Sequence, residues 1–220
     1  MIDYNVISTG SKGNAVALNK NILIDAGVPF RALSAVYRGL QLVLLTHIHG
    51  DHFNQPTLRR LAQERPTLRF GCCEWLVAPL VKCGVDKGNI DVYKPDLLYN
   101  YEVFTVCPFR LVHDVPNCGY KLHFFEQGSV VYATDTNSMS HVDARGYDLY
   151  MLEANYNQAE IEQRIREKQV TGIFCHEYKV LKNHLSQEKA EKWLACQIEQ
   201  NSRYVWLHQH EEPKCPIPSL

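Results

Sequence analysis

The sequence has no excess of charge of either sign. Its 220 residues include 23 lysines and arginines and 24 aspartates and glutamates, which leaves a formal net charge of -1. A protein that follows nucleic acid over an extended surface needs a basic field, because contacts with phosphate dominate its affinity. The balance argues against an extended nucleic-acid interface and against recruitment to an anionic membrane.

Long apolar runs, signal segments and Cys-x-x-Cys pairs are also missing. No run approaches the roughly 18 apolar residues of a membrane-spanning helix, and Met1–Asn5 has no charged-then-apolar character. The eight cysteines are scattered, so a cysteine zinc cluster is not expected. We expect free thiols and a cytoplasmic location, since reducing compartments disfavour disulfides. No linker or repeat divides the chain, and we expect one domain over residues 1–220.

What the sequence does have is a dense cluster of metal-binding residue types, Thr46-His47-Ile48-His49-Gly50-Asp51-His52. It follows the apolar run Leu40–Leu45, which predicts a buried strand. Imidazole and carboxylate suit zinc, manganese or iron. His47 and His49 do not share a helix face, so they can meet on one ion only from a loop, and Gly50 permits the turn of that loop. Asp51 and His52 would then face a second ion.

Strand and helix patterns alternate around this motif and predict a layered α/β (α+β) fold. Strands are expected over residues 2–8, 15–18, 22–25, 40–45, 68–71, 89–93, 101–108, 109–113, 129–134, 148–155 and 204–207, and a short strand or turn over 171–177. Helices are expected over residues 29–39, 54–64, 74–83, 158–169 and 187–200. Ser186 is the predicted N-cap of the last helix, which leaves His184 on a loop.

Thr-His-x-His-x-Asp-His resembles the metal signature of the metallo-β-lactamase fold hydrolases. The resemblance runs from about Ser8 to His208 and implies a four-layer αβ/βα sandwich with two divalent ions, zinc or alternatively manganese, at its edge. It also implies that Asp25 supports the metal loop and that the Ser/Gly/Asn-rich loop Ser8–Asn14 lies close to the site. The implied ligands are His47, His49 and His113 for one ion, Asp51, His52 and His208 for the other, and Asp135 as a bridge. His210 competes with His208 for the last position.

Three short pieces resemble one branch, the YycJ/WalJ-type phosphodiesterases with the related phage anti-Pycsar cyclic-nucleotide hydrolases. They are Val112-His113-Asp114 before Pro116–Tyr120, Glu153-Ala154-Asn155, and His184-Leu185-Ser186. The resemblance implies that His184 protonates the leaving group and that Glu153 orients His184. The branch continues with His-Asp where this chain has Tyr156-Asn157, so those two positions receive no role.

The predicted function is hydrolysis of 3′,5′-cyclic nucleotides by a dinuclear-metal phosphodiesterase, in which metal-activated hydroxide attacks phosphorus. Asp51, His184 and Glu153 are the expected catalytic set. A phage-encoded immune-evasion enzyme acting in the host cytoplasm fits this function. A single-stranded DNA 5′ exonuclease and a non-catalytic metal-binding scaffold stay as alternatives, but the lack of a basic track favours the small nucleotide substrate. Related enzymes of this branch form dimers, so a homodimer is expected. A ribonuclease Z would need a protruding tRNA-binding arm, and no Gly/Lys-rich insertion of that length is present.

Overall fold

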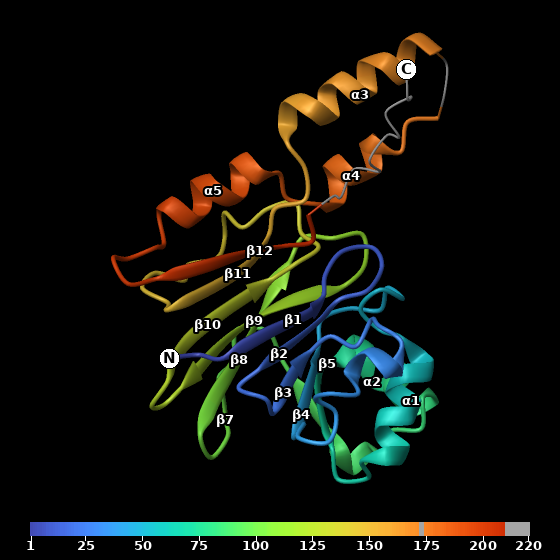
Figure 1. The fold of residues 1–220 in the computed structure, drawn as a ribbon, viewed down its shortest axis with the longest axis vertical. Helices are drawn as coiled ribbons and strands as arrows, with labels where there is room; N and C mark the ends of the chain where they lie inside the picture. The colour runs from blue at the N-terminus through green and yellow to red at the C-terminus, as the bar shows by residue number, and fades with distance from the viewer. Residues whose placement is uncertain (172–173, 210–220) are drawn as a thin grey trace, which may run out of the picture.

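The computed structural model describes residues 1–171 and 174–209, and its strands form two six-stranded sheets (Figure 1). The first sheet has the order β1 (Tyr4–Ser8), β2 (Ala15–Leu18), β3 (Ile22–Ile24), β4 (Leu42–Leu45), β5 (Arg69–Cys73) and β6 (Ile90–Tyr93). The second has the order β12 (Arg203–Leu207), β11 (Leu149–Glu153), β10 (Gly128–Ala133), β9 (Asn117–Phe124), β8 (Phe104–Leu111) and β7 (Tyr99–Asn100). β3 to β6 run parallel to one another, as do β10 to β12, so several strands of each sheet end at the same edge.

Three apolar interfaces hold the layers together. Strand β4 shows how they form, because Leu42 and Leu44 pack between the sheets while Val43 and Leu45 pack on the outer face of the first sheet. Helices α1 (Gln55–Glu64) and α2 (Val77–Lys82) cover that outer face. Helix α5 (Gln187–Ala195) covers the second sheet through its buried residues Ala190 and Leu194. The predicted four-layer αβ/βα architecture is confirmed.

Local signals set the boundaries of several elements. Asn19 and Lys20 have φ of 47° and 63° and form the tight turn of the β2–β3 hairpin. The Asn54 side chain accepts a hydrogen bond from the Thr57 backbone and caps α1. Ser186 caps α5 by accepting from the Lys189 backbone, as the sequence predicts.

Some predicted boundaries are wrong. One strand, β8, replaces the two strands expected on either side of Pro108, which pairs with Tyr120 of β9. The short neighbour β7 pairs only with Thr105 and Val106, so Pro108 needs no ladder donor on that side. Residues 29–39 hold only a short 3₁₀ helix, η1 (Phe30–Leu33). Strand β9 and helix α4 (Glu177–Asn183) were not predicted at all.

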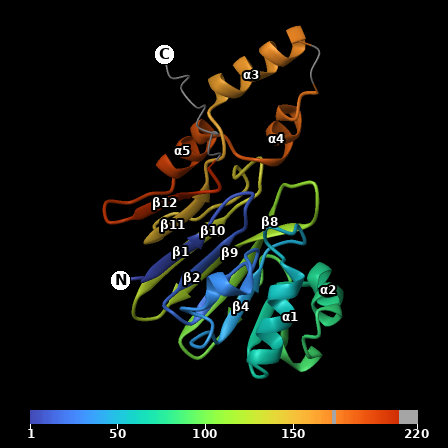
Figure 2. The same cartoon turned by 45° about the vertical axis from the view of Figure 1, so that its right-hand side comes forward.

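Helices α3 (Gln158–Thr171) and α4 form a hairpin that stands away from the two sheets in both views (Figures 1 and 2). Ile161 and Ile165 are the buried apolar residues of α3, whereas Val170 and Phe174 are 88% and 84% exposed. Lys168 Nζ on α3 binds Glu177 Oε1 on α4 at 2.6 Å. The projecting arm is thus a pair of helices with charges of both signs rather than a Gly/Lys-rich insertion. Within residues 1–171 and 174–209, no helix has the length and apolarity to cross a membrane.

Candidate metal centre

The centre lies where strands of both sheets end. Asp25 follows β3, the loop Thr46–His52 follows β4, Asp135 follows β10 and His208 follows β12. Asp25, Asp135 and His208 have φ of 60°, 58° and 53°, in the left-handed region that few non-glycine residues adopt. The chain therefore turns sharply at three strand ends, and such strain persists only where the surrounding contacts hold it.

Three histidines form a first group of ring nitrogens. His47 and His49 lie on the loop after β4, and His113 follows β8. His113 Nε2 lies 3.2 Å from His49 Nδ1, and one ring nitrogen of each of the three residues lies within 4.8 Å of the others. His47 Nε2 is buried and has no hydrogen-bond partner among the described residues. Burial lowers the pKa of His47 well below its ordinary value, so this ring keeps a lone pair for a cation.

Asp51, His52 and His208 form a second group by the same measure. Asp51 Oδ2 lies 3.9 Å from His52 Nε2 and 4.0 Å from His208 Nε2. In the part of the chain that the structure describes, His208 Nε2 is also buried without a hydrogen-bond partner. A buried orphan of this kind costs roughly 1–3 kcal/mol, and a bound cation would remove that cost.

Asp135 lies beside both groups. Its Oδ2 is 2.9 Å from His52 Nε2, and it forms a further ligand group with His47 and His52. Burial alone would raise the pKa of Asp135, but the charges on His52 and His208 lower it well below its ordinary value. Burial alone would lower the pKa of His52, but Asp135 and Asp25 raise it well above its ordinary value. The raised pKa keeps a proton on His52, and a cation that binds its Nε2 atom must displace that proton.

A buried carboxylate behind the loop fixes the loop's shape. Asp25 Oδ1 accepts from the Thr46 backbone at 3.0 Å, and Asp25 Oδ2 lies 2.7 Å from His52 Nδ1. This contact turns the other nitrogen of His52 toward Asp135, as carboxylates behind metal-binding imidazoles commonly do. A Cβ on Gly27 would lie 1.7 Å from the Asp51 carbonyl oxygen, so only glycine lets the segment after Asp25 approach the loop.

Gly50 lies in the predicted turn of the loop, where the His52 backbone donates to the His49 carbonyl oxygen at 2.9 Å. Its φ is not in the left-handed region, and a Cβ added there would meet open space. The turn therefore forms without a backbone conformation that only glycine can adopt. The close approach that does require glycine is at Gly27, outside the motif.

Glu153 organises the second sheet's side of the centre. It is fully buried, and its Oε1 lies 2.6 Å from His184 Nδ1 and 2.9 Å from His208 Nδ1. Its Oε2 accepts from the backbones of Thr136 at 3.0 Å and Leu185 at 3.3 Å. Burial alone would raise the pKa of Glu153, but its hydrogen bonds to His184 and His208 lower it. One carboxylate therefore orients two imidazoles, of which the sequence suggested only His184.

A fourth group of candidate ligands consists of Asp135, Glu153, His184 and His208. Glu153 already binds the Nδ1 atoms of both histidines, so an ion at this place would have to replace both hydrogen bonds. It would also leave the buried Nε2 of His208 without a partner. The first two groups fit a cation better, because their buried nitrogens otherwise stay unsatisfied.

The loop Ser8–Asn14 reaches the centre from the edge strand β1. Asn14 Nδ2 lies 2.8 Å from His52 Nε2, and the Asn14 backbone donates to the Asp51 carbonyl at 2.6 Å. Thr9 Oγ1 accepts from the His208 backbone at 2.7 Å. The family resemblance implied that this loop lies near the site, but the sequence gave no signal for these individual contacts. His210 lies outside the described residues.

The sequence matches a known protein family over most of its length. The model of the family described as beta-lactamase superfamily domain matches residues 20–208. The chain belongs to the beta-lactamase superfamily. The match spans every residue of the two histidine groups and Asp135. No curated protein sequence matches the chain.

Solved structures show the same fold. The metallo-beta-lactamase fold protein YhfI from Bacillus subtilis is 16% identical, with a TM-score of 0.69 over 94% of this chain and 86% of that one. The short form of human tRNase Z is 16% identical, with a TM-score of 0.67 over 95% of this chain and 92% of that one. A long-form RNase Z from yeast is 15% identical, with a TM-score of 0.65, and the match covers 100% of this chain and 39% of the yeast chain. At these identities the likeness establishes the fold alone.

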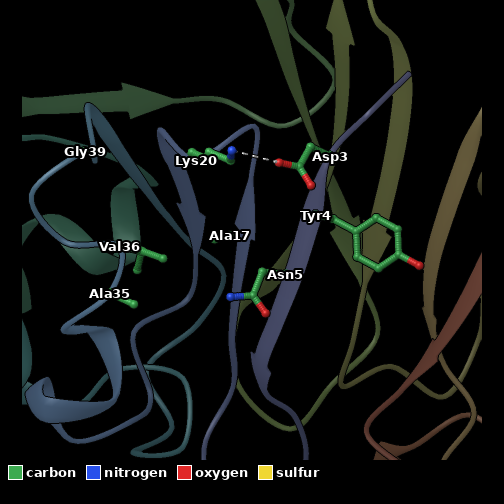
Figure 3. A pocket seen from close by; sticks show the side chains of 8 residues that line it. All are labelled: Asp3, Tyr4, Asn5, Ala17, Lys20, Ala35, Val36 and Gly39. Atoms are coloured by element: carbon green, nitrogen blue, oxygen red, sulfur yellow. Dashed lines mark ion pairs between the residues drawn. The ribbon is translucent and has the colours of Figure 1, made fainter.

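A separate hollow of about 360 Å³ lies over β1, β2 and the segment after η1 (Figure 3). Lys20 and Asp3 form an ion pair of 3.9 Å among its lining residues. Its lining shares no residue with the two histidine groups, Asp135 or Glu153. The candidate metal ligands therefore lie at the strand ends, apart from this hollow.

Proposed function

We propose that this protein is a metal-dependent phosphodiesterase that hydrolyses 3′,5′-cyclic nucleotides. The observation that carries the proposal is the combination of two ligand groups around Asp135 with an additional imidazole, His184, held by Glu153 at 2.6 Å. Two bound divalent ions would supply an activated water and a clamp for the phosphoryl oxygens. His47, His49 and His113 would hold one ion, Asp51, His52 and His208 the other, and Asp135 would serve both.

His184 supplies the proton that a phosphodiester needs for its departing alkoxide. Glu153 accepts the hydrogen bond from His184 Nδ1, so His184 Nε2 is the atom left to face substrate. The His184 side chain is 19% exposed, whereas Glu153 is fully buried. A positioned imidazole is suited to proton transfer near neutral pH. Such a donor favours a catalytic role over that of a metal-binding scaffold.

The balance of charge in the chain favours a small substrate over a nucleic acid. A net charge of -1 offers no basic field for an extended polyanion, and contacts with phosphate dominate the affinity of a protein that follows one. The resemblance to the YycJ/WalJ branch keeps a single-stranded DNA 5′ exonuclease as the second candidate.

A substrate panel separates these functions. Purified protein is loaded with zinc or manganese and given 3′,5′-cyclic mononucleotides, cyclic dinucleotides, single-stranded DNA and a tRNA precursor. We expect linear mononucleotides from the cyclic mononucleotides and slower or absent turnover of the rest. Degradation of DNA with inert cyclic mononucleotides would replace the first proposal by the exonuclease. A fully metal-loaded protein that leaves all four substrates intact would favour the scaffold.

We also propose that the active form is a homodimer in the cytoplasm of a bacterium, or of the host cell if a phage encodes it. Exposed apolar side chains at Leu97, Leu98 and Phe125 offer surface for such a contact. Light scattering at micromolar concentration should give twice the 25.3 kDa mass of the chain. A mass of one chain at that concentration would exclude the dimer.

A further inference from the structure

Asp114 has no part in either ligand group, yet it contacts two members of the first group, His49 and His113. Its Oδ1 lies 3.3 Å from His113 Nε2 and 3.5 Å from His49 Nε2. The contact between His49 Nδ1 and His113 Nε2 defines the side of the rings on which a cation would stand. A carboxylate at the outer nitrogen of His49 is then placed to fix the orientation and the basicity of that ring.

Helix α4 contacts the other oxygen of the same carboxylate. Asn183 Nδ2 donates to Asp114 Oδ2 at 3.2 Å, and Lys179 Nζ lies 3.8 Å from this oxygen. Lys179 and Asn183 are four residues apart, so they share one face of the helix. Asn183 is 7% exposed, whereas the Lys179 side chain is 63% exposed. The buried amide is the stronger of the two supports, because an exposed ion pair contributes little.

Asn183 also holds His113 directly. Its carbonyl oxygen lies 3.2 Å from His113 Nδ1, which makes Nδ1 the protonated nitrogen and leaves Nε2 with its lone pair. The last residue of α4 therefore supports one histidine through its backbone and a second through Asp114. The next residue, His184, contacts Glu153. The end of one short helix thus touches both halves of the centre.

We propose that Asp114 is a positioning residue that couples α4 to the first histidine group and raises the affinity of that group for a divalent cation. The inference rests on the metal site of the proposed function and not on its substrate. Asp114 binds no substrate in this role. It acts by holding His49 at Nε2 and by anchoring Asn183, whose carbonyl oxygen holds His113.

Cobalt(II) alone is a suitable probe, because its visible absorption reports the geometry of its ligands. Titration of the metal-free full chain should show a cation affinity about 10–100-fold lower for Asp114→Ala, the usual cost of removing such a support. The cobalt spectrum should change as well. Asp114→Asn keeps an acceptor oxygen without the charge, so its affinity should lie between those of the wild type and Asp114→Ala.

Asp143→Ala is the matched control, since Asp143 is an exposed carboxylate paired with Arg145. It should bind cobalt as the wild type does. Asn183→Ala removes the amide but keeps the backbone contact to His113, and we expect a smaller loss of affinity than for Asp114→Ala. This second variant tests the inference even if Asp114→Ala does not fold.

Wild-type affinity and an unchanged spectrum in Asp114→Ala and Asn183→Ala would overturn the inference, even if the metal-free melting temperature fell. That outcome would leave the proposed function intact. A wild-type protein that binds no cobalt would instead remove the metal site itself. The two failures are therefore distinguishable without any assay of turnover.

Discussion

The two sheets contribute to the centre in different ways. The first sheet offers His47, His49, Asp51 and His52 from one loop, whereas the second offers its groups singly from separate strand ends. Each half has one fully buried carboxylate that contacts histidine Nδ1 atoms, Asp25 in the first and Glu153 in the second. Asp25 fixes one histidine and the start of its loop, but Glu153 fixes both His208 and His184. In the proposed enzyme, the first half would serve cation binding alone, whereas the second half would combine cation binding with proton donation.

Removal of the carboxylate that both halves share should have the largest effect. Asp135→Ala should lose bound metal and reduce cyclic-nucleotide hydrolysis to background, because Asp135 contacts His52 and forms a ligand group with His47 and His52, one histidine from each of the two groups. Metal content by elemental analysis and turnover are measured on the same preparation. Asp143→Ala serves as the control, and retention of full metal in Asp135→Ala would contradict the shared role.

The next largest effect tests the proton donor alone. His184→Ala should keep its metal and lose about 10²–10⁴-fold in turnover of a cyclic nucleotide, the usual range for general acid catalysis. A bis-nitrophenyl phosphodiester has a good leaving group and needs little protonation, so its hydrolysis should fall much less. Equal losses on the two substrates, or loss of an ion, would assign His184 to metal binding instead.

Glu153→Gln should affect both functions of the second half. The amide places a donor against either the two imidazoles or the two backbone N–H groups, all of which need an acceptor. We expect turnover between the wild type and His184→Ala, together with a cation affinity about 10-fold lower. Cobalt titration and the leaving-group comparison should therefore change together. A change in only one of them would break the coupling that Glu153 provides.

Asp25→Asn gives the corresponding change in the first half. It weakens the contact to His52 Nδ1 and should lower cation affinity by about 10-fold. Once metal is saturating, the ratio of rates on the two substrates should match the wild type, because His184 is untouched. A shift in this ratio would show that the two halves are less independent than the contacts indicate.

The smallest effect is expected outside the centre, where the end of α3 meets the start of α4. Hydrogen bonding from Lys168 lowers the pKa of Glu177 from 4.5 to about 2. A carboxyl whose pKa is lower in the folded state adds stability above pH 4.5, and this stability is lost as pH falls toward 2. Lys168→Met should remove at most about 1 kcal/mol, seen as faster amide exchange in α3 at pH 6 with little change at pH 2. Equal acceleration at both pH values would exclude the ion pair as its cause.

The sequence identifies the first half of the centre best, because its residues are contiguous in the chain. Seven adjacent residues after an apolar strand carry their own signal, whereas His113, Asp135 and His208 were located through the family resemblance and the order of strands. The contacts of Asn14 and Asn183 could not be foreseen, because asparagine in loops and helix ends has many ordinary uses. Asp114 belongs to the short motif Val112-His113-Asp114, but nothing in the local sequence shows that it faces His49.

The errors in the fold have equally specific causes. Proline usually ends a strand, and only the shortness of β7 lets Pro108 continue β8. Helix α4 has seven residues, too few for an apolar period to be visible. The need for glycine at Gly27 was not predicted, because the close approach there is a tertiary contact that no local pattern reveals.

Because strand ends from both sheets meet at the centre, a bound ion would also affect how long the folded protein persists in a cell. An ion held between loop 46–52 and His208 would fasten two sheets that are otherwise joined by apolar packing and by hydrogen bonds such as that from the His208 backbone to Thr9 Oγ1. Chelation would then loosen the seam between them and expose chain to proteases, since ligands that bind only the folded form stabilise it by mass action. Cellular metal supply would set the abundance of the protein as well as its turnover.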